Sequence, residues 1–285
     1  MIVAWKYAKE LTKQFNENNH WRLHSRFDNG INFVNQQNEL LFIGSDKNGE
    51  LPFAIHLTYL ELTKLKKQIT AESCLYFKDD CFYDQTNPTV QVTLTNCLTY
   101  QTTLLQTKLP LKQEQMNGLI NLAKTCSLKN GFDTALPTSL KAVMEGNNPL
   151  KHAFQQLLST DASEIEAGLR YYVGRGVGLT PSGDDFLVGL FCLQQAYSIL
   201  DQQVNQILTN LLYGEQLTTD IGKAYLLAAL KGQFSTTLLQ LIEELTTGND
   251  QQKLTIIFNK LIQNGHTSGV DTATGLLAGL LIRYN

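Results

Sequence analysis

VQVTLTNCLTYQTTLLQTKLPLKQEQMNGLINLAKT (residues 90–125) contains the change of pattern that decides the fold class. Its first five residues, VQVTL, alternate apolar and polar side chains and are rich in β-branched types, as in a strand. After Pro110, apolar residues return every three or four positions, which is the period of an amphipathic helix. We therefore predict an α+β protein with a β-rich N-terminal domain, residues 1–110, followed by a mostly α-helical C-terminal domain, residues 111–285.

Before this stretch, the sequence is typical of short strands separated by Asn, Asp, Gly and Pro. One interruption, residues 59–69, has apolar side chains at helical intervals and is predicted to form a helix on the sheet. The predicted strands include INFV (31–34), LLFIG (40–44), FAIHL (53–57) and VQVTL (90–94).

After this stretch, the pattern is almost wholly helical. Within 251–264, Leu254, Ile257, Phe258 and Leu261 mark one buried stripe. The segment 126–149 holds two glycines and two prolines and is expected to be an irregular connection or partly a short helix. The predicted helices are 111–125, 150–169, 185–200, 202–213, 220–231, 234–246, 251–264 and 271–283.

Composition excludes several classes of protein. The formal net charge is −3 and no dense run of Lys and Arg occurs, which argues against nucleic acid as a partner. The most apolar stretches, 186–193 and 275–282, are shorter than the roughly 20 residues that cross a membrane. The N-terminus lacks the long apolar region of a secretory signal, so a cytoplasmic protein is expected. The five cysteines have no C-x-x-C spacing and are predicted to be reduced, mostly buried thiols.

The strongest local signal is GRGVGLTPSGDDF (174–186), between two predicted helices. Glycines let successive backbone N–H groups point at one anion, and a helix start adds unpaired N–H donors. The motif therefore predicts a seat for phosphate or carboxylate, although Gly183 and Asp184 could simply turn and cap a helix. The candidate binding residues here are Arg175, Gly176, Gly178, Thr180, Ser182 and Gly183.

Two adjacent carboxylates follow the glycines. Asp184 beside Asp185 adds like-charge repulsion, which favours a nearby cation or proton donor. The two residues are therefore candidate ligands for Mg²⁺, which prefers oxygen. Adjacent aspartates point about 100° apart on a helix, so both could reach one ion only at a frayed first turn.

A second loop, NGHTSGVDTATGLLAGL (264–280), repeats the same succession of glycine, hydroxyl and aspartate. We expect the two loops to face each other across one pocket, with Thr267 and Ser268 as further binding residues. In the helix that follows, Gly275, Ala278 and Gly279 would let another backbone come close.

His266 is the only histidine in either loop, and histidine is the residue type best suited to act as a general acid or base near neutral pH. It could equally be a helix cap or a hydrogen-bonded imidazole. Thr218-Thr219-Asp220 lies where a helix should start, so it is most simply a cap whose hydroxyls could also reach the pocket.

In the N-terminal half, His24, Ser25 and Arg26 share one predicted strand. Strand alternation sends Ser25 to the face opposite His24 and Arg26, so a nucleophilic Ser/His pair is expected to be geometrically poor. A role on the sheet surface is the safer prediction.

Taken in order, these motifs resemble the AllH-like family, formerly a domain of unknown function. GRGVGLTPSGDDFLVGLF (174–191) is similar to the hallmark of that family. The resemblance continues through Thr218-Thr219, AALKGQFS (228–235) and GHTSGVD (265–271), and more weakly through HSRF (24–27) with Asn32. It spans most of the chain and departs near Gly222, where the family pattern has a small hydroxyl residue.

The resemblance implies a subunit of a three-component oxamate carbamoyltransferase in the anaerobic breakdown of allantoin, a purine catabolite. Such a complex interconverts oxalurate and phosphate with oxamate and carbamoyl phosphate, and it would supply two partner subunits, one similar to acyl-CoA synthetases. For this chemistry we expect the Gly178 to Gly183 backbone and Thr180 to stabilise charge on the carbamoyl oxygen. Asp184, His266 and Asp271 are the candidate catalytic residues for moving the proton.

Two alternatives stay open. One is a Mg²⁺-dependent nucleotide or acyl-phosphate transferase or ligase, in which Asp184, Asp185 and Asp271 would hold the ion. The other is a non-catalytic scaffold subunit that binds a small anion and holds the partner subunits together. Only the first of these implies a cofactor.

Overall fold

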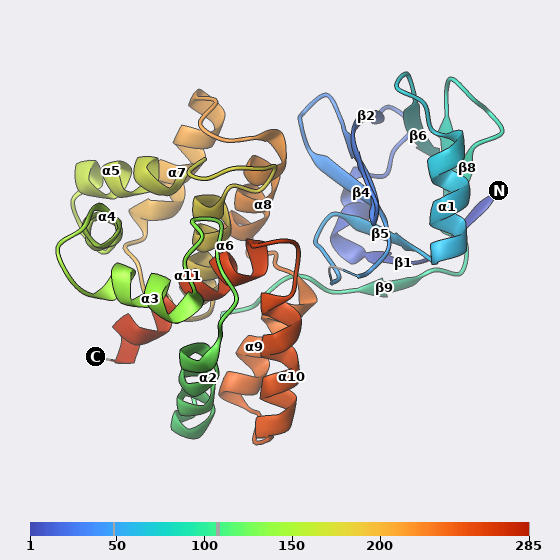
Figure 1. Ribbon diagram of the computed structural model, residues 1–285. Coiled ribbons are helices and arrows are strands. Elements are labelled where there is room, and N and C mark those ends of the chain that lie inside the picture. Colours follow the sequence, from blue (N-terminus) through green and yellow to red (C-terminus); the bar gives the residue numbers. More distant parts are fainter. Residues whose placement is uncertain (48, 107–108, 285) are drawn as a thin grey trace. The chain divides into compact units, whose positions relative to one another are not determined.

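The computed structural model describes residues 1–47, 49–106 and 109–284. The chain divides into two compact units, Met1–Thr102 and Thr103–Asn285 (Figure 1). The first unit consists mainly of strands and the second of helices. The predicted α+β class, with a β-rich part followed by a helical part, is confirmed.

The sheet of the first unit closes on itself. Among the described residues it has nine strands in the order β5-β4-β3-β2-β6-β7-β8-β1-β9, and β1 also pairs with β5. The strands are β1 (Ile2–Ala8), β2 (His20–Phe27), β3 (Gly30–Val34), β4 (Leu40–Gly44), β5 (Ala54–Leu57), β6 (Cys74–Lys78), β7 (Cys81–Asp84), β8 (Gln91–Thr93) and β9 (Leu98–Tyr100). The β1–β5 pairing removes the free edge of β5, whereas β9 pairs with β1 alone among the described strands.

The strands bury large apolar side chains in the core of this unit, and β3 and β5 are buried along their whole length. Trp21, Phe33, Ile55 and Phe82 point inward and are fully buried. Helix α1 (Tyr59–Gln68) begins at its N-cap Thr58, packs against β1, β3 and β5, and buries Leu62 and Leu65. A short 3-10 helix, η1 (Lys9–Gln14), follows β1.

The second unit contains the helices α2 (Gln113–Thr125), α3 (Leu136–Met144), α4 (Pro149–Leu157), α5 (Ala162–Tyr172), α6 (Ser182–Tyr197), α7 (Gln203–Gly214), α8 (Asp220–Leu230), α9 (Thr236–Thr246), α10 (Gln251–Ile262) and α11 (Ser268–Tyr284). Two expectations differ from this arrangement. The single helix predicted at 150–169 is two helices, because Asp161 caps α5 by accepting from the N–H groups of Ser163 and Glu164. The segment 126–149 contains a full helix, α3, with Pro137 in its first turn, where proline is tolerated.

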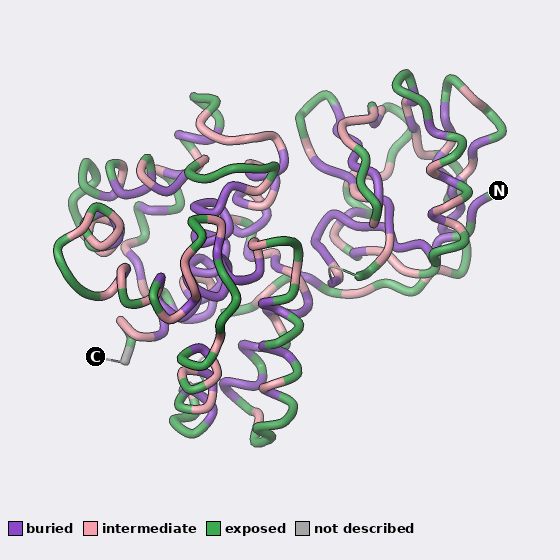
Figure 2. The backbone as a smooth tube through the Cα atoms, viewed as in Figure 1, coloured by how far each residue is buried: buried purple, intermediate pink, exposed green. Residues whose placement is uncertain are grey.

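Helix α6 runs through the middle of the second unit and packs along α11 (Figure 1). Nearly all of its residues are buried (Figure 2). Glycines allow the close approach: a Cβ at Gly189 would overlap the carbonyl oxygen of Thr272, and one at Gly275 would overlap that of Phe186. The expected role of Gly275 in close backbone packing is confirmed.

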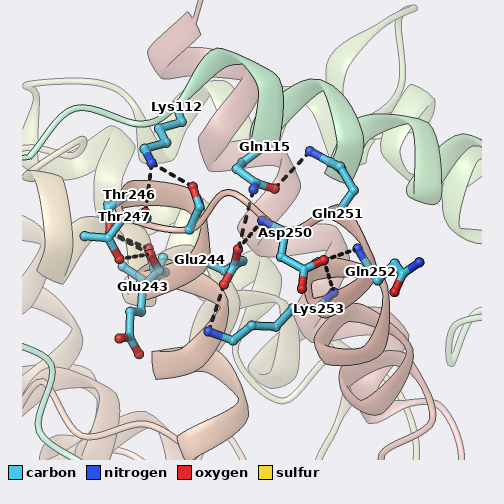
Figure 3. Close-up of polar contacts among 12 residues, drawn as sticks. Lys112, Gln115, Glu243, Glu244, Thr246, Thr247, Asp250, Gln251, Gln252 and Lys253 are labelled. Carbon is cyan, nitrogen blue, oxygen red and sulfur yellow. Dashed lines mark hydrogen bonds and ion pairs between the residues drawn. The ribbon is translucent and has the colours of Figure 1, made fainter.

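A buried carboxylate joins three other helices of this unit. Glu244 on α9 is 1% exposed and accepts from the Asp250 backbone N–H at 3.2 Å and from Lys253 Nζ at 3.0 Å (Figure 3). Gln115 on α2 lies beside it, with 3.4 Å between its Nε2 and Glu244 Oε1. Since a buried charge must be paired, these contacts tie α2, α9 and the start of α10 together.

The five cysteines are free. Cys81 and Cys192 are buried, whereas Cys74, Cys97 and Cys126 are partly exposed, so the expectation of mostly buried thiols holds for only two of the five.

Candidate functional site

The first glycine-rich loop, residues 173–181, is shaped by left-handed glycines. Gly174, Gly176 and Gly178 have φ angles of 72°, 117° and 93°, a region that side chains disfavour. The loop returns to the helix start through a hydrogen bond from Gly183 N–H to the Arg175 carbonyl at 2.8 Å. A Cβ at Gly183 would overlap the Tyr172 carbonyl oxygen, so the loop and α6 touch where only glycine fits.

Helix α6 begins at Ser182 rather than near Asp185, and its N-cap, Pro181, offers no side-chain cap. Asp184 therefore lies inside the first turn and does not cap the helix. Its carboxyl group reaches outside α6 instead. Oδ1 accepts from Gly174 N–H at 2.8 Å and Oδ2 accepts from the Thr218 hydroxyl. Thus Asp184 links the first loop to the segment before α8.

The second loop, residues 263–267, meets the first at the starts of α6 and α11. Thr180 Oγ1 lies 2.9 Å from Ser268 Oγ, so the first loop contacts the first residue of α11, directly after the second loop. We call the group formed by Asp184, Asp185, Asp271, Thr180 and Ser268 the acidic junction.

A third segment completes the acidic junction. Gly131 N–H donates to Asp271 Oδ2 at 3.1 Å. A Cβ at Gly131 would overlap the Ser182 hydroxyl and would come within 3.3 Å of Thr267 Oγ1. Sequence reasoning missed this residue, although the Asn130-Gly131 pair before α3 is a turn signal that could have drawn attention to it.

All three carboxyl groups of the acidic junction are buried, with exposures of 1%, 5% and 3% for Asp184, Asp185 and Asp271. Burial raises the pKa of Asp184 to about 6, against hydrogen bonds from Thr218 and Gly174. Burial likewise raises the pKa of Asp271 to about 6. The pKa of Asp185 is raised well above its usual value, first by burial and then by the charges of Asp271 and Asp184, while the nearby Ser268 and Thr180 hydroxyls oppose the shift.

Thr219 caps α8, as predicted, by accepting from Gly222 N–H at 2.9 Å. Its hydroxyl also donates to the Leu179 carbonyl and so holds the first loop. A Cβ at Gly222 would overlap Asp184 Oδ2, so a side chain at this position would require the Asp184 carboxyl group to move.

Several predicted site residues lie outside the acidic junction. Arg175, Gly176, Gly178 and His266 are exposed on the two loops. The Arg175 guanidinium stacks 3.8 Å from the Tyr171 ring centroid, and its Nε donates to the Tyr171 carbonyl at 3.0 Å. We call these four exposed loop residues the exposed rim.

In the first unit, the expectation that His24 and Ser25 point apart is wrong. His24 Nδ1 lies 3.0 Å from Ser25 Oγ, and Asn32 Nδ2 donates to the same hydroxyl at 3.2 Å. The reason is a register shift between Leu23 and Ser25 in the β2–β3 ladder, which interrupts the strict alternation of side chains.

Asp184 and Asp185 are the residues predicted as ligands for Mg²⁺. Both oxygens of Asp184 accept hydrogen bonds from the protein. Across the part of the chain that the structure describes, no three His, Cys, Asp or Glu side chains are grouped so that they could hold an ion. The pKa values of all three carboxyl groups are raised by burial, which favours their protonated forms.

The fold and the acidic junction together define a two-unit α+β protein with a buried carboxyl and hydroxyl site in its helical unit. The chain belongs to the AllH family: the model of the family's N-terminal domain matches residues 3–99, and the model described as oxamate carbamoyltransferase subunit AllH matches residues 172–280. The second match contains both loops and every residue of the acidic junction. No solved structure matches the chain. Among the described residues, no helix has both the length and the apolar character needed to span a bilayer.

Proposed function

We propose that this chain is a subunit of an oxamate carbamoyltransferase complex, and that its helical unit binds a small anionic substrate. The candidate substrates are carbamoyl phosphate, oxamate and oxalurate, in a cytoplasmic complex of allantoin-type purine catabolism with two partner subunits. The observation that carries the proposal is the meeting of two loops of the same design at the starts of α6 and α11, inside the segment that matches the family model.

The exposed rim is the proposed seat for the negative end of the substrate. Gly176 and Gly178 carry no side chain that would keep a ligand from the backbone, and a Cβ at Gly178 would meet nothing within 4 Å. Among the described residues, the N–H groups of residues 176–180 donate to no protein acceptor. Such N–H groups, with the exposed Arg175 and the positive end of α6, favour a phosphate or carboxylate.

The proposed reaction forms one bond and breaks another. The oxamate nitrogen attacks the carbamoyl carbon of carbamoyl phosphate, the bond from that carbon to the phosphate oxygen breaks, and the nitrogen loses a proton. Donors of the first loop, including Thr180, would stabilise charge on the carbamoyl oxygen. His266 on the rim and Asp271 at the start of α11 are the proposed acid–base groups, while Asp184, whose oxygens are both engaged, is proposed to position the first loop.

A ligand-binding measurement tests this function. We expect oxamate or carbamoyl phosphate to raise the melting temperature of the full chain, because a ligand at 100 times its Kd stabilises the folded state by about 2.7 kcal/mol. Thr180→Val should weaken this stabilisation, since it removes the hydroxyl that contacts Ser268 and borders the rim.

The matched control is Thr209→Val on α7, whose hydroxyl bonds only to its own helix, at the Asn205 carbonyl. This variant should keep the full ligand response. If none of carbamoyl phosphate, oxamate and oxalurate stabilises the wild-type chain, the proposed function is wrong. If Thr180→Val loses binding but the assembled complex keeps its turnover, the subunit is a scaffold and not the site of transfer.

A further inference from the structure

The three carboxyl groups of the acidic junction differ in what they bind. Asp184 uses both oxygens, and Asp271 Oδ2 holds the Gly131 N–H. Asp185 is also buried, yet its Oδ2 has no hydrogen-bond partner among the described residues. A buried carboxyl oxygen without a hydrogen-bond partner destabilises the folded state. The fold carries this cost at Asp185, whereas the carboxyl groups of Asp184 and Asp271 accept hydrogen bonds from the protein.

The surroundings of Asp185 determine which kind of group could satisfy that oxygen. The leading influences on its pKa are burial, the hydroxyls of Ser268 and Thr180, and the carboxyl groups of Asp271 and Asp184. None of these is a cation, and Arg175 is exposed and stacked on Tyr171. A phosphate or carboxylate placed here would be repelled, because like charges at short range are poorly screened in a buried site. A neutral group with N–H donors would not be repelled.

A primary amide has the required properties. It carries no charge and presents two N–H donors, and a carboxyl oxygen can accept from them in either protonation state. Oxamate has an amide at one end and a carboxylate at the other, and carbamoyl phosphate similarly joins a carbamoyl amide to a phosphate. The two parts of the proposed site match these two ends. The acidic junction is acidic and buried, which suits the neutral amide, and the exposed rim offers backbone N–H groups and an arginine, which suit the anionic end.

We propose that Asp185 Oδ2 accepts a hydrogen bond from the amide nitrogen of the substrate, and that the acidic junction thereby selects molecules with a carbamoyl or primary amide group over molecules of similar shape with a carboxylate in its place. This inference rests on the proposed function and names the specificity-determining residue of that site. Asp184 is a positioning residue, because both of its oxygens hold neighbouring segments, and Asp271, the proposed acid–base group, also holds Gly131 through its Oδ2.

The experiment compares three ligands by calorimetric titration of the full chain. Oxamate carries the amide, oxalate replaces it with a second carboxylate, and N,N-dimethyloxamate keeps the carbonyl but loses both N–H donors. We expect oxamate to bind at least about tenfold more tightly than either analogue, the factor typical of a site left with an unpaired buried polar group.

Two variants assign the preference to Asp185. Asp185→Ala should bring the three affinities to within about threefold of one another, because the acceptor is gone. Asp185→Asn keeps a carbonyl acceptor and should retain the preference for oxamate over N,N-dimethyloxamate. The readout is the affinity for oxamate divided by the affinity for each analogue. A variant that weakens binding of all three ligands equally leaves this ratio unchanged and so cannot be mistaken for a loss of the preference.

The outcomes separate the two proposals. If oxamate binds the wild-type chain no better than oxalate and N,N-dimethyloxamate, or if Asp185→Ala keeps the preference, the role of Asp185 is overturned while the proposed function stands. If the wild-type chain binds none of oxamate, oxalurate and carbamoyl phosphate, both proposals are overturned. Should Asp185→Ala fail to fold, the three-ligand comparison on the wild-type chain and on Asp185→Asn still tests whether Asp185 selects the amide.

Discussion

Asp184 contributes to the fold as a hydrogen-bond acceptor and opposes it as a buried charge. Its two oxygens join Gly174 to Thr218, which are separated by more than 40 residues in the sequence. Its ionised form loses solvation in the core, and its pKa is raised to about 6 as a result. Because the unfolded chain has the lower pKa, protonation of Asp184 is linked to folding.

The stability of the protein should therefore depend on pH. A carboxyl group whose pKa is about 6 when folded and 3.8 when unfolded stabilises the fold fully below pH 3.8, and this contribution is lost as the pH rises through 6. We expect the free energy of unfolding, measured by urea denaturation, to be lower at pH 8 than at pH 5. The part due to Asp184 should amount to at most about 3 kcal/mol.

Asp184→Asn removes the titrating group and should flatten this pH dependence, as Asp271→Asn should for the same reason. Asp28→Asn, at a fully exposed side chain, is the control and should leave the profile unchanged. An unaltered slope in Asp184→Asn would mean that the carboxyl group titrates alike in the folded and unfolded chains.

At the scale of single residues, the sequence predicted the local parts of the site and missed the tertiary ones. The two loops were found because glycine, hydroxyl and aspartate follow one another at short spacing. The division of tasks among the three aspartates was not predictable, since it depends on Gly174, Thr218 and Gly131, which come from other segments. His24 and Ser25 were misjudged because a register shift leaves no clear mark on composition.

At the scale of elements, the pairing of α6 with α11 fixes where the two loops meet. Gly189 and Gly275 bring the two backbones into contact, and the first turns of both helices supply the acidic junction. A change in the spacing of these helices would consequently also move Thr180 away from Ser268.

Gly275→Ala tests this dependence. In a free helix, alanine would be more stable than glycine by about 1 kcal/mol, but here the new methyl group would overlap the Phe186 carbonyl oxygen. We expect the free energy of unfolding to fall by about 1–3 kcal/mol, the usual cost of overpacking. Ligand-induced stabilisation should fall with it.

The matched control is Gly214→Ala at the end of α7, where a Cβ would meet nothing within 4 Å. That variant should be as stable as the wild type or slightly more stable. A Gly275→Ala variant with unchanged stability would show that α11 can shift without cost.

Periodicity predicted most helices of the second unit to within a few residues, because each buries one face against its neighbours. It failed where a polar residue ended a helix. Residues 150–169 keep apolar side chains at helical spacing, yet Asp161 starts a new helix in the middle. The strand β1 was not predicted, although Ile2 and Ala4 are buried while Val3 and Trp5 are exposed, as alternation requires.

At the scale of the whole molecule, each unit has a core of its own. The closed sheet of Met1–Thr102 buries Trp21 and Phe33, and the helical unit buries nearly the whole of α6. The two family matches, residues 3–99 and 172–280, fall on different units. All residues of the acidic junction and of the exposed rim lie in the helical unit, so that unit should hold the binding site without help from the first.

A fragment covering residues 103–285 should therefore fold alone and bind oxamate. We expect a helical circular dichroism spectrum, one cooperative thermal transition, and a rise in melting temperature with oxamate comparable to that of the full chain. Asp185→Ala in the fragment is the control for binding at the same site. A fragment that folds but does not respond to oxamate would contradict the assignment of the binding site to the helical unit alone.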